Sequence, residues 1–388
     1  MGVGVLTAAS RASGPRAPDR STGLPPDCQR AASVSKVAPV LPEADTGGMT
    51  AKRWFWLPGL LLAGVILRGQ PATTEEVPVH DPVMIRQDGT YYLFATGRGI
   101  AVWSSRDREH WVKEAPVFAE PPAWAVGAVT GFKGHIWAPD ISYHAGRYYL
   151  YYSVSAFGKN TSCIGVATNV TLDPRDSRFR WEDHGKVIES VPGRTNWNAI
   201  DPNLIESADG TAWLAFGSFW EGLKLAKLAP GRLHLAEPPV ELPTLASRQD
   251  SESLPPPPGS GYPTNAGENA IEAPFIFRHG EHFYLFASID YCCRGKDSTY
   301  KMIVGRADKV AGPYRDRDGK PLAQGGGTIL LAGDERWHGV GHNAVCSFDG
   351  VDYLVFHGYD ATDPAGKAKL RILPIDWDKS GWPVVKQR

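Results

Sequence analysis

The sequence is poor in cysteine, in runs of like charge and in helical periodicity. Its 388 residues hold 5 cysteines, and no two of them have the CxxC spacing of a metal or redox site. We interpret the four after Cys28 as buried or structural, with disulfides permitted but not required. Lys plus Arg (41) nearly balances Asp plus Glu (42), which gives no indication of a nucleic-acid or membrane partner. No segment shows apolar residues at helical spacing over a useful length, and this excludes a mainly helical fold.

The N-terminal part divides into two segments. Residues 1–48 are rich in Ala, Ser, Pro, Arg and Gly without an apolar period, and we interpret them as disordered or as a misassigned upstream start. Residues 49–72 begin at a second Met and combine Lys52 and Arg53 with an apolar run from Trp54 to Leu67, which predicts a signal peptide. The run is short for a membrane span, although a retained anchor is the alternative. We therefore expect a secreted or periplasmic protein.

The rest of the chain repeats one pattern five times. A polar anchor residue precedes an apolar strand, a tight turn containing Gly or Asp follows, and a second and a third strand come after it. The anchors lie about 60 to 70 residues apart, and an internal repeat of this kind decides the architecture. They are Asp81, Asp140, Asp201, Glu272 and His342.

Five units of this length, each with about four antiparallel strands, predict an all-β protein, a five-bladed β-propeller over residues 75–388. A β-helix is the alternative, but its repeats are much shorter. Residues 248–269, with Pro255–Pro258, predict a long loop between the third and fourth blades.

Equivalent positions in the five blades would bring the anchors together around the axis. Carboxylates crowded in this way repel one another and cost free energy when buried, so the set is a candidate functional site. Paired carboxylates suit the cleavage of a glycosidic bond, where one protonates the leaving oxygen and another activates water. Each Asp alone could instead cap a turn, and Asp140 is the anchor that we most expect to be structural.

Nine segments in order along the chain carry a further signal. They are Val79–Pro82, Trp137–Asp140, Asn198–Asn203, Gly217–Trp220, Ile271–Pro274, Ala287–Cys293, Ser298–Lys301, Gly325–Thr328 and Gly341–Asn343. As an ordered set they resemble glycoside hydrolase family 43, and within it the arabinan endo-1,5-α-L-arabinosidases (endo-arabinanases). The resemblance runs from about Val79 to Pro383.

The resemblance implies an inverting hydrolase of internal α-1,5-L-arabinofuranosidic bonds. Asp81 would be the general base, Glu272 the general acid, and Asp201 the residue that modulates the pKa of the acid and orients it. His342 would help to hold a calcium ion in the central channel through water, because imidazole is a poor direct ligand of calcium. A neutral core histidine is the alternative for His342.

Substrate contacts are expected from Trp137, Gly165, Asn198, Ser218 and Trp220. The chain has 13 Trp, 14 Tyr and 14 Phe, and several of these rings could stack on sugar faces, although packing explains such rings equally well. The expected partner is arabinan or an arabino-oligosaccharide, with no nucleic-acid or membrane partner, and we expect a monomer.

Two alternatives stay open at the level of sequence, an exo-acting enzyme of the same family and a non-catalytic propeller, whereas a propeller of the invertase group is disfavoured. An exo-acting α-L-arabinofuranosidase or β-xylosidase of the same family would use the same three carboxylates. A propeller of the invertase group would need an Arg-Asp-Pro signature, whereas this chain reads Ile200-Asp201-Pro202. A non-catalytic carbohydrate-binding propeller would not need both Asp201 and Glu272.

Overall fold

The computed structural model of the protein describes residues 72–249 and 261–386, and the predictions for residues 1–48 and 49–71 lie outside this range. Within it the secondary structure is almost entirely antiparallel sheet, in five separate sheets. The single α-helix in these ranges is short, α1 (Ala123–Ala128), and the 3-10 turns are η1 (Thr74–Glu76), η2 (Gly295–Asp297) and η3 (Leu322–Gln324). In the part described, no helix is long and apolar enough to cross a membrane.

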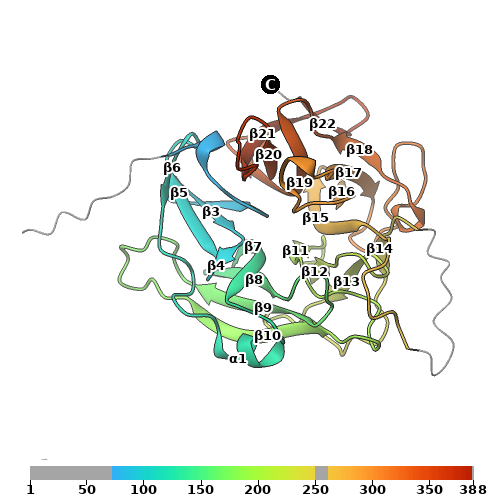
Figure 1. Ribbon diagram of the computed structural model, residues 1–388, viewed down its shortest axis with the longest axis horizontal. Helices are drawn as coiled ribbons and strands as arrows, with labels where there is room; N and C mark the ends of the chain where they lie inside the picture. Colours follow the sequence, from blue (N-terminus) through green and yellow to red (C-terminus); the bar gives the residue numbers. More distant parts are fainter. Residues whose placement is uncertain (1–71, 250–260, 387–388) are drawn as a thin grey trace, which may run out of the picture. The chain divides into compact units, whose positions relative to one another are not determined.

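The five sheets are the five predicted blades, arranged around a central axis (Figure 1). The first two sheets have the strand orders β1-β6-β5-β3-β2 and β10-β9-β8-β7-β4. Their strands are β1 (Ala72–Thr73), β2 (Val83–Gln87), β3 (Thr90–Ala95), β4 (Gly97–Arg98), β5 (Ala101–Ser105), β6 (His110–Lys113), β7 (His135–His144), β8 (Arg147–Val154), β9 (Ser162–Asn169) and β10 (Glu182–Ser190).

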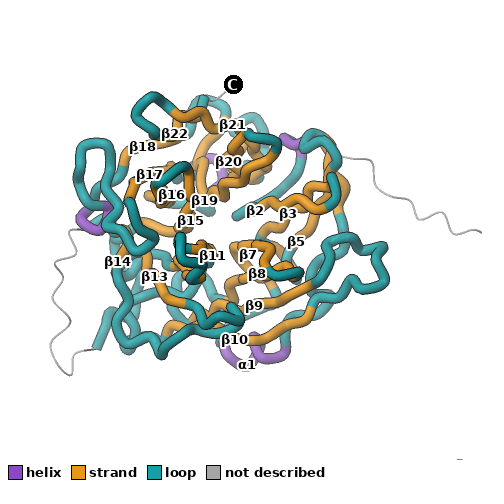
Figure 2. The backbone as a smooth tube through the Cα atoms, turned by 180° about the vertical axis from the view of Figure 1, so that it is seen from behind, coloured by secondary structure: helices purple, strands orange, loops and turns teal. Residues whose placement is uncertain are grey.

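The other three blades each contain four strands in chain order. These strands are β11 (Asn203–Glu206), β12 (Ala212–Phe216), β13 (Leu223–Lys227), β14 (Thr244–Ala246), β15 (Ile271–His279), β16 (His282–Ile289), β17 (Lys301–Ala307), β18 (Thr328–Leu331), β19 (Trp337–Phe348), β20 (Val351–Asp360), β21 (Ala368–Trp377) and β22 (Pro383–Val385). Seen from behind, β2, β7, β11, β15 and β19 lie nearest the centre (Figure 2).

The turns between first and second strands form where the sequence predicts them, with small shifts. Asp88 and Gly89 both have positive φ (49° and 72°), as do Asp349 and Gly350 (54° and 80°). Two residues with positive φ are typical of the type I′ hairpin, whose twist matches that of the flanking strands. In the fourth blade the turn is Gly280-Glu281, one residue later than expected, because His279 pairs with His282.

Five clusters of buried apolar side chains hold the blades together, and each cluster lies between two neighbouring blades. The cluster that contains Val77, Leu93, Val355 and Leu370 joins the first blade to the last. There the N–H of Leu370 donates to the carbonyl oxygen of Val77 (3.0 Å). Five interfaces for five blades mean that the ring is closed, so the inner strands converge on one channel mouth.

Candidate active site

Each blade has a residue in the left-handed region in or just before its inner strand. These residues are Asp81, Ala138, Asp201, Ala273 and His342, with φ of 54°, 43°, 57°, 56° and 50°. Two positions later each blade pairs in the same register, for example Val83 with Phe94 and Asn203 with Ala215. The left-handed residue is therefore the true point of equivalence among the blades.

This register corrects the prediction that all five anchors are equivalent. Asp81, Asp201 and His342 occupy the left-handed position, but Glu272 lies one residue before it and Asp140 two residues after it. Asp140 pairs with Tyr151 inside the sheet, at the position that Val83 and Asn203 occupy in their blades. Four of the anchors reach the channel mouth, and Asp140 does not line the cavity there.

The buried carboxylate of Asp140 stabilises the contact between the second and third blades. Its Oδ2 accepts the N–H of Leu204 (2.7 Å), and its Oδ1 lies 3.4 Å from Asn203 Nδ2. Burial raises the pKa of Asp140 to about 7, against the effect of these two hydrogen bonds. Asp140 thus has the structural role that we expected of it.

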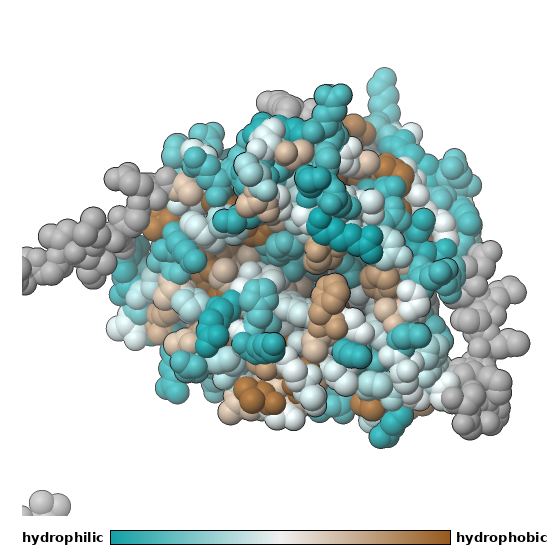
Figure 3. Space-filling view, viewed as in Figure 1, coloured by the Kyte–Doolittle hydropathy of each residue, from teal (hydrophilic) through white to brown (hydrophobic). Residues whose placement is uncertain are grey.

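A cavity of about 950 Å³ opens at the channel mouth. Its volume is at the upper end of the range of roughly 300–1,000 Å³ that is usual for ligand sites. Asp81, Asp201, Glu272 and His342 all line it, together with Trp137, Asn198, Ser218 and Trp220. Eight of the nine predicted site residues therefore lie around one space. In the view of Figure 3 the surface is mostly hydrophilic or near neutral, with small separate apolar patches.

Asp81 is held by three neighbours. Thr96 Oγ1 donates to its Oδ2 (2.5 Å), and His342 Nδ1 lies 3.0 Å from its Oδ1. Burial by itself would raise the pKa of Asp81, but the charge and hydrogen bond of His342 hold it well below its usual range. The backbone N–H of Asp81 donates to His357 Nδ1 (3.2 Å). Asp81 is consequently an oriented, ionised carboxylate.

The imidazoles around Asp81 differ in charge. Burial would lower the pKa of His342, but the negative charges of Asp81 and Asp201 raise it to about 9. Burial, with the charge of His80 beside it, keeps the pKa of His357 well below its usual value. His342 is therefore the cation of the group, and His357 is a neutral acceptor that orients the backbone of Asp81.

Asp201 is buried and forms hydrogen bonds to both neighbouring blades, the second and the fourth. Its N–H donates to Ser153 Oγ (2.9 Å), and its Oδ2 accepts the N–H of Ala273 (3.2 Å), the residue after Glu272. Burial raises the pKa of Asp201, His342 opposes that shift, and the negative charge of Glu272 adds to it. Asp201 therefore retains a proton more readily than an ordinary aspartate.

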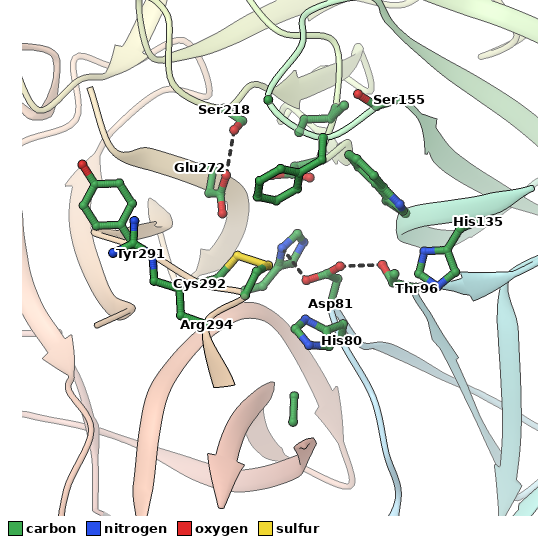
Figure 4. Close-up of a pocket in the computed structure, with 18 of the residues that line it drawn as sticks. His80, Asp81, Thr96, His135, Ser155, Ser218, Glu272, Tyr291, Cys292 and Arg294 are labelled. Atoms are coloured by element: carbon green, nitrogen blue, oxygen red, sulfur yellow. Dashed lines mark hydrogen bonds and ion pairs between the residues drawn. A yellow bond between two sulfur atoms is a disulfide. The ribbon is translucent and has the colours of Figure 1, made fainter. Parts of the chain in front are cut away.

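Glu272 is clamped by two hydroxyl groups. Ser218 Oγ donates to its Oε2 (2.7 Å), and Tyr300 Oη donates to its Oε1 (2.7 Å). Figure 4 shows the hydrogen bond from Ser218 and shows the carboxylates of Glu272 and Asp81 pointing into the same cavity from different sides. Tyr300 is fully buried, and its ring lies against Gly341, where a Cβ atom would be 2.1 Å from Tyr300 Cδ1.

The predicted substrate contacts differ in their exposure and in the hydrogen bonds that they already form. Asn198 accepts a hydrogen bond from Ser162 Oγ (2.7 Å), Trp220 Nε1 donates to the carbonyl oxygen of Pro263 (3.0 Å), and both side chains are buried. Asn198 and Trp220 therefore form part of the cavity wall, whereas Ser218 forms a hydrogen bond with Glu272. Trp137 is partly exposed at the cavity.

The prediction for Gly165 does not agree with the structure. Gly165 is buried in β9, away from the cavity, and a Cβ atom there would lie 2.6 Å from the Tyr152 ring and 2.7 Å from the Trp124 ring. Its lack of a side chain allows this close packing, so it is a core residue rather than a substrate contact.

Thr96, Tyr300 and His357 are site residues that the sequence analysis did not assign. Tyr300 falls in a segment that carried the resemblance, and that was the only signal for it. The cysteines agree with the prediction of buried or structural residues, although the position of the disulfide was not predicted. Cys163 is buried, but Cys292 and Cys293 form a disulfide at the cavity wall, where Cys293 is exposed.

The metal-ligating side chains at the site do not form a calcium cage. Their closest group in the described chain is His80, Asp81 and His357. Calcium takes six to eight oxygen ligands, whereas this group offers two imidazoles and one carboxylate that is already bonded to Thr96 and His342. Direct coordination of calcium by these residues does not fit this ligand set.

A propeller that presents an ionised carboxylate, a clamped carboxylate and a proton-retaining neighbour in one cavity has the machinery of a glycoside hydrolase. Residues 75–383 match the sequence profile described as "Glycosyl hydrolases family 43", and the chain belongs to this family.

Three relatives carry more specific names. The chain is 48% identical over 342 residues to "Extracellular exo-alpha-(1->5)-L-arabinofuranosidase ArbA" of Cellvibrio japonicus, covering 88% of this chain and 95% of that protein. It is 40% identical over 309 residues to "Extracellular endo-alpha-(1->5)-L-arabinanase 1" of Bacillus subtilis, covering 79% and 87%. The solved structure of Cellvibrio cellulosa α-L-arabinanase complexed with arabinohexaose superposes with a TM-score of 0.75 at 51% identity, covering 80% of this chain and 96% of that chain.

Proposed function

We propose that the protein is an arabinanase, an inverting hydrolase that cleaves internal α-1,5-L-arabinofuranosidic bonds of arabinan. The observation that carries the proposal is the clamped Glu272 beside the buried Asp201, in a cavity that also holds the ionised Asp81. The relatives named for arabinan support the choice of substrate.

Each carboxylate has a role that follows from its surroundings. Asp81, ionised and oriented by Thr96 and His342, takes a proton from the attacking water. Glu272 gives its proton to the departing oxygen, and the anion that remains accepts the hydrogen bonds of Ser218 and Tyr300. Asp201 modulates and orients the acid through its charge and its bond to Ala273. Inversion requires the base and the acid to lie about 6.5–9.5 Å apart, so that water fits between base and sugar.

Exo action is the second candidate, because the chain is 48% identical to the relative named as an exo-enzyme and 40% identical to the one named as an endo-enzyme. Both modes use the same carboxylates, and they differ in whether the cavity admits an internal bond or only a chain end. The names of both relatives also support secretion, as the predicted signal peptide does.

Calcium stays a prediction. An ion in the channel would be held through water by His342 and would supply positive charge near the carboxylates. Metal analysis of the purified protein before and after dialysis against EDTA tests it, and protein without calcium at full activity would contradict it.

Product analysis on linear α-1,5-arabinan tests the proposed function. An endo-enzyme lowers viscosity early and releases a mixture of oligosaccharides, whereas an exo-enzyme releases one short product while viscosity falls slowly. Proton NMR of the first product should show the anomer of inverted configuration. Glu272→Gln should lower turnover by several orders of magnitude while oligosaccharide binding is kept, and failure of the wild-type protein to cleave arabinan would overturn the proposal.

A further inference from the structure

The loop between β16 and β17, residues 290–300 (here the disulfide loop), forms part of the cavity wall. Its adjacent Cys292 and Cys293 are joined by a disulfide, and both line the cavity that holds Glu272 and Asp81. Cys292 is partly exposed and Cys293 is exposed. The sulfur–sulfur bond lies among the side chains drawn around this cavity in Figure 4. The disulfide therefore presents surface to whatever the cavity binds.

The disulfide loop is fixed by hydrogen bonds that do not involve the sulfur atoms. The N–H of Cys293 donates to Tyr359 Oη (2.9 Å). The carbonyl oxygen of Tyr291 accepts the N–H groups of Thr299 (2.9 Å) and Tyr300 (3.1 Å). Asp290, the first residue of the loop, forms an ion pair (2.9 Å) with Lys301, the first residue of β17. A surface held in this way is ordered before a ligand arrives, which reduces the entropic cost of binding.

A stabilising role explains this disulfide poorly. Disulfides stabilise mainly by closing a loop in the unfolded chain, and the effect grows with the length of that loop. Here the two cysteines are one residue apart in the sequence, so the closed loop is as short as it can be. The bond restricts the unfolded chain very little, and its exposed position at the cavity requires another explanation.

The chemistry of the loop surface fits a sugar ring. A disulfide carries no strong hydrogen-bond donor, and sulfur is polarisable and packs well against apolar groups. Next to it the Tyr291 side chain is 37% exposed, and the Arg294 guanidinium lies 4.2 Å from the Tyr291 ring centroid. A furanose ring has C–H groups on its faces and hydroxyl groups at its edge. The disulfide can pack against such a face while Arg294 donates to a hydroxyl oxygen.

We propose that the Cys292–Cys293 disulfide, flanked by Tyr291 and Arg294, is a preformed carbohydrate subsite that packs against one arabinofuranosyl residue of the bound chain. The proposal rests on the proposed function, since it names a further part of the same substrate site. The intact disulfide supplies a fixed apolar surface without hydrogen-bond donors, and two separate thiols or hydroxyls do not.

Binding without turnover is the direct test. In the Glu272→Gln background, the affinity for a linear arabino-oligosaccharide is measured by calorimetry with and without the added pair Cys292→Ser and Cys293→Ser. We expect the Kd to rise about 5- to 10-fold, and 10-fold corresponds to about 1.4 kcal/mol. Cys346→Ser in the same background is the control, because Cys346 is a free cysteine in β19 outside the cavity lining.

Reduction gives a second, independent measurement in otherwise wild-type protein. A phosphine reductant should raise the KM for arabinan by a similar factor and leave kcat within about twofold, and it should not affect the doubly substituted protein further. An unchanged Kd, or a loss of kcat at unchanged KM, would overturn the subsite and leave the loop a structural support. Wild-type protein that neither binds nor cleaves arabinan would instead overturn the proposed function.

Discussion

The hydroxyl group of Tyr300 donates a hydrogen bond of 2.7 Å to the carboxylate of Glu272 from a fully buried position. Burial, and then the negative charge of Glu272, raise the pKa of Tyr300 well above its usual value, so that the hydroxyl keeps its proton. With Ser218 on the other oxygen, Tyr300 fixes the direction in which Glu272 can act. Tyr300 and Ser218, which exchange no proton with the substrate in the proposed reaction, therefore fix the position of the Glu272 carboxylate.

Tyr300→Phe should lower kcat by about 10- to 100-fold, because it removes one hydrogen bond to a charged group, worth roughly 1.5–3 kcal/mol. The bond is strongest to the anion left after proton transfer, so KM should change little. The measurements are kcat, KM and the pH–rate profile, whose basic limb should move to higher pH.

The control for this variant is Tyr314→Phe. Tyr314 is also buried, and its hydroxyl donates to the carbonyl oxygen of Val310 (2.8 Å), away from the cavity. It should lose comparable stability and keep kcat. Equal losses of kcat in both variants would show that the effect of Tyr300 is only structural.

Gly341→Ala should displace Tyr300, because the added methyl group would lie 2.1 Å from the ring atom Cδ1. Overpacking of this kind costs typically about 1–3 kcal/mol of stability. We expect a lower Tm and a kcat at least as low as that of Tyr300→Phe. Gly231→Ala is the matched control, since a methyl group there has no atom within 4 Å. Gly341→Ala with normal kcat would mean that Tyr300 is not needed in this position.

The strands and the five-fold repeat could be predicted from sequence because both depend on local patterns of apolar residues and turns. The register at the channel mouth was predicted wrongly, because the acidic residues do not all occupy equivalent positions in their blades. Ala138 and Ala273 hold the left-handed position without a distinctive side chain, next to irregularities in the strand pairing. The better marker was Pro82, Pro139, Pro202 and Pro274, each directly after that position.

The residues that orient the carboxylates were missed for a different reason. Thr96 reaches Asp81 from the end of the neighbouring strand, and Tyr300 reaches Glu272 across 28 residues of sequence. Contacts of this kind depend on how strands pair in three dimensions, and no spacing in the chain reports them. The three carboxylates and Ser218 could be selected from sequence as candidate site residues, but the hydroxyl groups of Thr96 and Tyr300 could not.

Replacement by Asn should have little effect on activity at Asp140 and a large effect at Asp201. Asp140→Asn keeps an oxygen that can accept the N–H of Leu204, and since Asp140 lies outside the cavity lining, activity should stay within about twofold of wild type. Asp201→Asn removes the ionisable carboxyl group that interacts with Glu272 and should lower kcat by about 100-fold or more. The rate of arabinan hydrolysis at saturating substrate measures both effects. A large loss of kcat in Asp140→Asn would show that Asp140 takes part in catalysis.

The pH dependence of stability should also identify Asp140. Burial raises its pKa in the folded protein to about 7, from an ordinary value of 3.8. The folded state therefore binds this proton more tightly than the unfolded state, so the contribution to stability is complete below pH 3.8 and is lost as the pH rises through 7. Asparagine does not titrate, so the free energy of unfolding of Asp140→Asn should increase relative to wild type between pH 4.5 and pH 8, by an amount on the order of a few kcal/mol.

Urea denaturation of both proteins across this pH range measures the difference in the free energy of unfolding directly. Taking the difference between the two proteins cancels the titration of other groups. If the difference in the free energy of unfolding between the two proteins stays constant with pH, Asp140 is ionised in the folded protein over the whole range from pH 4.5 to pH 8. The hydrogen bond from Leu204 would then outweigh the cost of burying the charge.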